Sequence, residues 1–128
     1  MTDKQKDNRK KALEDLLVQV EGGAFDATKD RVARFNDFRR LAETAFVQDV
    51  TGQNALSWNA YKGSLDAAKA LHEAALPGRS WEIWRVDNDE QVPFYGVNIP
   101  NVDTPYSATP ARAWIIAILK ALIAKATP

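Results

Sequence analysis

The sequence predicts an α+β fold: a small antiparallel sheet, formed by a hairpin at about residues 81–99, between helical layers made of three to four helices. Three observations predict this class. Several segments repeat apolar residues at helical spacing on one side only. Two runs rich in aromatic and β-branched residues are joined by a short polar stretch, as in a β-hairpin. The last segment is apolar on nearly all sides, which is typical of a buried helix.

The length and composition predict one domain over residues 1–128, with residues 1–11 as a polar extension that is frayed or forms the exposed start of the first helix. Seventeen basic residues balance seventeen acidic ones, so no global field favours nucleic acid, a membrane or an acidic substrate. The chain has no cysteine, which excludes disulfides and thiol catalysis. Residues 1–11 carry no apolar stretch of the secretory type, and we predict a cytoplasmic protein.

The first half predicts two helices. An apolar stripe from Ala12 to Val20 forms the first, which ends at Gly22 because glycine favours helix termination. The second begins near Asp26 or Thr28, both good N-caps, and presents aromatic residues such as Phe38 on one face. Residues 50–63 contain glycines and asparagines and are predicted to be a loop, with Trp58 and Tyr61 fastening it to the body. The role of the long stretch 35–58 is left open.

A third helix is predicted to begin after Ser64, an N-cap residue, and to bury a stripe of Leu65, Ala68, Leu71, Ala75 and Leu76. His72 is the only histidine in the chain and lies at the edge of this stripe. A lone histidine cannot build a metal site, and no nucleophile is spaced to form a catalytic cluster with it. We interpret it as a structural residue.

The hairpin comprises Trp81–Val86 and Phe94–Ile99. Alternate side chains of a strand point to opposite faces, and apolar residues occupy both sets in the first strand. Both faces of the sheet are therefore predicted to be covered by helices. Asp87, Asp89 and Glu90 cluster at the hairpin tip, which indicates a solvated turn.

The segment between the hairpin and the last helix is the best candidate for a partner-binding loop, because it concentrates polar groups in a connection. Its candidate residues are Asn101, Asp103, Thr104, Tyr106 and Ser107. The alternative is that it merely crosses from the sheet to the helix. A second candidate surface is a basic patch of Arg31, Arg34, Arg39 and Arg40, which either meets phosphates or is a solvated helix face.

The last helix is predicted to start at Thr109 and Pro110, an N-cap followed by a proline at the first helical position. Lys120 interrupts its apolar run, which is too short to cross a bilayer. Ile115, Ile118, Leu119 and Leu122 recur at helical spacing and form its core stripe. Trp114, Ile116 and Ile123 add further apolar surface, and a homodimer would bury the surplus. The alternative is that the helices before and after the hairpin enclose this surface within the monomer.

No motif for phosphate binding, dinucleotide binding, nucleophilic catalysis or metal binding is present, so we predict neither an enzyme nor a cofactor. Four segments, taken in order, resemble the phage ABA sandwich domain, a family of small proteins of phages and prophages. They are Leu13–Glu21, Tyr61–Leu71, Leu76–Trp81, and Ala108–Ala113 leading into Leu119–Leu122. The resemblance implies a sheet between two helical layers and brings no established activity or catalytic residues. The stretch Phe35 to Trp58 is longer than that pattern.

Two functional hypotheses follow. The first is a phage or prophage accessory protein, in the cytoplasm of the bacterial host, that binds another protein such as a host factor or a defence component. The second is a nucleic-acid-associated phage protein that uses the basic segments 4–11 and 31–40, which overall neutrality disfavours. A minor virion structural component is a third, weaker hypothesis.

Overall fold

The computed structural model describes residues 2–23, 31–46, 52–87 and 93–126, and the side chains of residues 31–34 are not among them. The described residues form α1 (Asp3–Glu21), α2 (Arg31–Ala45), α3 (Gln53–Tyr61), α4 (Leu65–Ala75), β1 (Glu82–Val86), β2 (Phe94–Asn98), β3 (Tyr106–Ser107) and α5 (Pro110–Ala126). The predicted α+β class with a small antiparallel sheet is therefore confirmed. The predicted number of three to four helices is too low, because these residues contain five.

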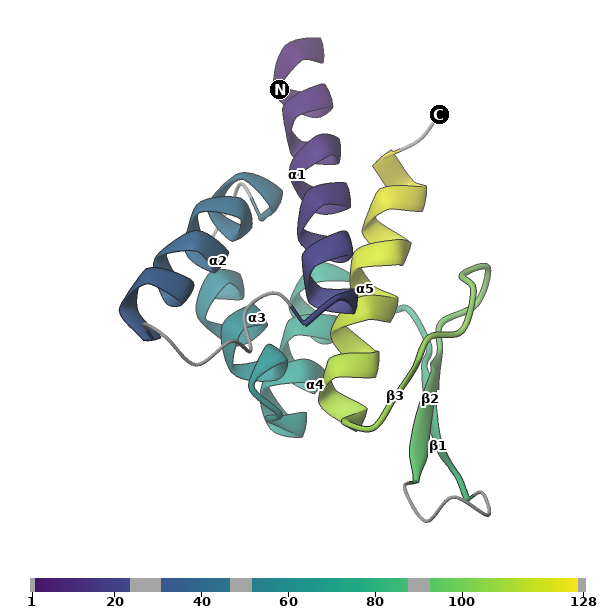
Figure 1. Cartoon of the computed structure of the whole chain (residues 1–128). Helices are drawn as coiled ribbons and strands as arrows, with labels where there is room; N and C mark the ends of the chain where they lie inside the picture. Colours follow the sequence, from purple (N-terminus) through teal and green to yellow (C-terminus); the bar gives the residue numbers. More distant parts are fainter. Residues whose placement is uncertain (1, 24–30, 47–51, 88–92, 127–128) are drawn as a thin grey trace.

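Helix α5 is the centre of the fold. It contacts α1, α3, α4, β2 and β3, and Figure 1 shows it between α1 and the sheet. It starts as predicted, with Pro110 as its first residue and the Thr109 carbonyl accepting from the Ala113 amide. Its predicted core residues are all buried: Ile115, Ile118, Leu119 and Leu122.

The expectation that α5 carries more apolar surface than one chain covers is wrong. Trp114 and Ile116 are buried within a single copy, and Ile123 is partly buried. The chain covers them because α5 is enclosed by three helices on one side and by the sheet on the other. The reason given for a homodimer through α5 therefore does not hold.

Helices α1 and α2 lie side by side on the outer side of this centre (Figure 1). α1 begins at Asp3, where Thr2 and Gln5 form a reciprocal capping box, so residues 3–11 are the exposed start of the helix. Its predicted stripe is buried at Leu13, Leu16 and Val20. The predicted start of α2, near Asp26 or Thr28, lies outside the described residues.

The segment predicted to be a loop at 50–63 contains α3, which is a correction. Gly52 precedes it with φ 72°, a conformation that glycine adopts without strain. The helix forms because Trp58 and Tyr61, one turn apart, both pack on Phe38 of α2 with ring centroids 5.1 and 5.8 Å away. Tertiary packing thus outweighs the weak helix propensity of the asparagines. The prediction that these two aromatic residues fasten the segment to the body is confirmed.

Helix α4 is capped as predicted, since the Ser64 hydroxyl accepts from the Ala67 amide at 3.1 Å. Ala68, Leu71 and Leu76 are buried, as expected. Leu65 is 44% exposed, so its assignment to the buried stripe is wrong. It occupies the first helical position.

His72 is a structural residue with both ring nitrogens in hydrogen bonds. The indole N–H of Trp114 donates to its Nδ1 at 3.2 Å, so its Nε2 carries the proton and donates to the carbonyl of Arg79 at 2.8 Å. The side chain is buried, not at the edge of the stripe as predicted. It joins α4 to α5 and to the segment that leads into β1.

The three strands are antiparallel in the order β1-β2-β3. Ile83 pairs with Val97, and both point inward with Trp81, whose ring lies 4.3 Å from that of Trp114 on α5. Strand β3 was not predicted. The sheet contacts α5 through β2 and β3, so the described helices cover one of its faces. The prediction of helices on both faces is therefore wrong.

Because α5 is buried on all sides, replacing one of its large residues creates a cavity. Leu119→Ala is expected to lower the free energy of unfolding by about 2–5 kcal/mol, measured as a shift in the denaturation midpoint. Val18, which is 68% exposed on α1, supplies the matched control, and Val18→Ala is expected to leave the midpoint nearly unchanged. Equal effects of the two substitutions would contradict the central position of α5.

The two hydrogen bonds of His72 predict a second effect on stability. His72→Leu fills this place with an apolar side chain and leaves the Trp114 N–H and the Arg79 carbonyl without their partner. A buried polar group that loses its partner costs about 1–3 kcal/mol. Chemical denaturation of His72→Leu and of the exposed neighbour Glu73→Ala compares the two positions, and only the first substitution should be destabilising.

Candidate functional site: the outer face of the sheet

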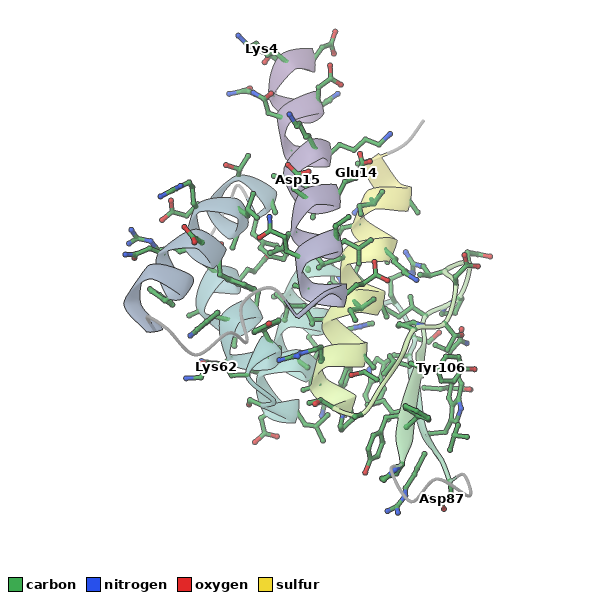
Figure 2. The ribbon with its side chains drawn as sticks, in the orientation of Figure 1. Lys4, Glu14, Asp15, Lys62, Asp87 and Tyr106 are labelled. Carbon is green, nitrogen blue, oxygen red and sulfur yellow. The ribbon has the colours of Figure 1, made fainter. Side chains whose placement is uncertain are left out.

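The face of the sheet that points away from α5 is the candidate site, and we call it the outer face. Strand alternation and the observed register place on it Glu82, Trp84, Val86, Phe94, Gly96, Asn98 and Tyr106. Figure 2 shows Tyr106 on the sheet and Asp87 at the end of β1, remote from α2 and α3. The face is built by all three strands and carries three aromatic residues.

Trp84, Gly96 and Tyr106 form a row across the three strands. Trp84 pairs with Gly96, which pairs with Tyr106. The two aromatic rings meet edge to face over the glycine, with centroids 6.2 Å apart and planes at 79°. A Cβ atom at residue 96 would lie 2.7 Å from the Trp84 ring and 2.9 Å from that of Tyr106. The missing side chain therefore provides the space in which the two rings meet.

The outer face is apolar and partly open to solvent. Tyr106 is 58% exposed and Phe94 39% exposed, and Val86, opposite Phe94, is also exposed. Isolated exposed apolar side chains are ordinary, but a contiguous group on one face is typical of an interaction surface. Aromatic residues are enriched in such surfaces because they offer a large rigid contact area.

β1 also carries a charged pair at its end, near the hairpin turn. Arg85 Nε donates to Asp87 Oδ1 at 2.6 Å, and this hydrogen bond and the carboxylate charge raise the pKa of the Arg85 guanidinium. Both side chains are exposed, so the ion pair adds little to stability. Arg85 alternates with Trp84 and Val86 along the strand, so the pair lies at the end of β1 on the side opposite the outer face.

The predicted partner-binding loop is divided by the structure. Asn101 and Asp103 line a hollow of about 360 Å³ beside Leu17 of α1 and Lys120 of α5. The Thr104 hydroxyl donates to Asn98 Oδ1 at 3.5 Å.

The other two predicted residues, Tyr106 and Ser107, form β3. The Ser107 hydroxyl accepts from the Thr109 amide at 3.2 Å and so supports the start of α5. Of the five predicted residues, Tyr106 is the one on the outer face.

The predicted basic patch is described only in part. Arg31 and Arg34 belong to α2, and their side chains lie outside the described atoms. Arg39 and Arg40 are exposed, and Arg39 Nε is 3.7 Å from Glu43 Oε1.

In the basic segment 4–11, Arg9 Nε donates to the carbonyl of Ala45 at 2.9 Å and joins α1 to the end of α2. Part of the positive charge thus has intramolecular partners.

Two kinds of feature are absent from the described residues. Among them, no group of three or more histidine, cysteine, aspartate and glutamate side chains is placed to hold a metal ion. No described helix is long and apolar enough to cross a membrane.

Trp84, Val86 and Phe94 were not predicted as site residues, although a signal for them existed. Trp84 and Val86, which alternate along β1 with Trp81 and Ile83, were interpreted as a surface beneath a helix. They indicate equally an apolar surface that no part of the chain covers.

The row over Gly96 makes a prediction about stability. Gly96→Ala places a methyl group against two rings, and overpacking of this kind costs about 1–3 kcal/mol, measured as a lower denaturation midpoint. The same substitution in a Trp84→Ala background should cost much less, since the closest contact is gone. An equal cost in both backgrounds would show that the glycine is needed for another reason.

Comparisons of this chain with protein-family models, with curated proteins and with solved structures find no match. The candidate function therefore depends on the surfaces of the chain itself.

Proposed function

We propose that this chain acts by binding another protein through the outer face of its sheet. The observation that carries the proposal is the gathering of Phe94, Val86 and Tyr106, all exposed, around the Trp84–Gly96 contact. Leaving such side chains in water is unfavourable, by about 25 cal/mol for each Å² of apolar area. A partner that covers them gains that free energy.

The geometry favours a protein partner with an apolar contact surface and polar groups at its rim. Tyr106 and Trp84 are suited to the centre of such an interface, because tyrosine and tryptophan carry much of the binding energy where they become desolvated. Glu82 and Asn98, which pair at one end of the outer face, would lie at the rim, where charges affect specificity and rate more than affinity.

The biological setting is part of the same proposal. A phage or prophage accessory protein is proposed from the ordered resemblance of four segments to the phage ABA sandwich domain alone, since no family model matches this chain. The absence of cysteine suits the reducing cytoplasm of a bacterial host. A host factor or a defence component is then the expected class of partner, and no catalytic step is proposed.

Nucleic-acid binding through segments 4–11 and 31–40 ranks second. Arg39 has a carboxylate within ion-pair distance, Arg9 is engaged with a backbone carbonyl, and Asp3 and Asp7 interrupt the basic residues of α1. These partners reduce the positive charge offered to phosphates. No described contact favours the third hypothesis, a virion component, over the other two.

A capture experiment tests the proposal. The wild-type chain and a Phe94→Ser, Tyr106→Ser variant are immobilised and exposed to extract of a bacterial host, and retained proteins are identified by mass spectrometry. A protein retained by the wild type should be lost with the variant, because both substitutions remove apolar area from the outer face. Leu65→Ser is the matched control, since Leu65 is an exposed apolar residue on α4.

Loss of the retained protein with Leu65→Ser, or its retention by the sheet variant, would contradict the assignment to the outer face. Nucleic-acid binding, the second hypothesis, is tested separately with duplex DNA. Binding through phosphates weakens steeply with salt because counterions are released. Tight binding at physiological salt that disappears with Arg39→Ala and Arg40→Ala would favour the second hypothesis.

A further inference from the structure

A groove of about 540 Å³ opens between the first turns of α1 and the end of α5, and it shares no residue with the outer face. Figure 1 shows these two helix ends at the same end of the molecule, where α1 extends beyond the other elements. Charged side chains of α1 form one side of the groove, and small or apolar residues of α4 and α5 lie opposite together with the charged Lys125. The lining residues that matter here are Asp3, Lys6, Asp7, Ala75, Leu122 and Ala126.

The charges of α1 at this groove are arranged for pairing with a copy of themselves. Asp3, Lys6 and Asp7 line the groove, and Lys10 continues the same helix face beyond it. The four charges alternate in sign. When two such helices pair in an antiparallel manner about a two-fold axis, Lys6 lies opposite Asp7 of the second copy, and Asp3 lies opposite Lys10. All four positions then face the opposite charge. In a parallel pair, each charge would face its like.

We propose that the α1–α5 groove receives the first turns of α1 from a second copy of this chain, which gives a symmetric dimer. Each copy supplies both a helix and a groove, as a two-fold interface requires. The inserted helix lies beside Leu122 and Ala126, and its charges pair with those of the helix that forms the groove. The sequence predicted a homodimer through the apolar surface of α5, and the dimer proposed here uses a different surface.

Charge complementarity makes the dimer sensitive to salt, because exposed ion pairs are weak and are screened within about 10 Å at 0.1 M ionic strength. Sedimentation velocity at low ionic strength is therefore the measurement. The wild-type chain, Lys6→Glu, Asp7→Lys and the double swap Lys6→Glu, Asp7→Lys are compared. Lys4→Glu is the matched control, since Lys4 lies on another side of α1, at the projecting end labelled in Figure 2.

The wild type is expected to form a dimer that dissociates as salt is added. Each single substitution places like charges opposite each other twice in the dimer and should weaken association about tenfold. The double swap restores opposite charges and should restore the dimer, whereas Lys4→Glu should leave it unchanged. Circular dichroism of every variant verifies that the fold is retained.

A wild-type chain that stays monomeric at low ionic strength and about 100 µM protein, where ion pairs are least screened, overturns the proposal. The proposal is also overturned if neither single substitution weakens the dimer. It is overturned as well if the double swap fails to restore the dimer. These results concern residues 3–10, and capture of a partner by the outer face is measured independently of them.

Discussion

The burial of α5 is the constraint on which the rest of the structure depends. A helix that is apolar on all sides must be enclosed completely, and α1, α3, α4 and the sheet each contact part of its circumference. The enclosure also explains local details. Trp81 leads into the sheet by packing on Trp114, and His72 bonds to the same indole. Ser107 ends the sheet by bonding to the amide of Thr109, next to the first residue of α5.

Enclosing α5 determines which apolar surface remains exposed. The inner face of the sheet, with Ile83 and Val97, lies toward the helix, while the outer face keeps Trp84, Phe94 and Tyr106. A three-stranded sheet has too few strands to be closed, and the described helices all lie on the side of α5 or beyond it (Figure 1). The proposed binding surface is thus a consequence of how the core is built.

The elements with strong local signals could be predicted from the sequence: the apolar stripe of α1, the capped start of α4, the hairpin and the proline start of α5. The rest depends on tertiary contacts. α3 forms because Trp58 and Tyr61 pack on Phe38, and β3 has two residues that pair only once β2 is in place. Of the candidate site, Tyr106 was predicted, but as a loop residue. Apolar residues at both odd and even positions of β1 indicate that the sheet has two apolar faces. They do not specify what covers either face.

Amide hydrogen exchange followed by mass spectrometry tests most directly whether α5 is the centre of the fold. Amides of a fully enclosed helix exchange only when the whole domain unfolds, whereas those of an exposed helix exchange through local opening. We expect α5 residues 114–122 to be the most protected of the described residues, and the first turns of α1 to be among the least protected of the described helices. Protection of α5 no greater than that of α2 would contradict it, because α5 would then open without unfolding the domain.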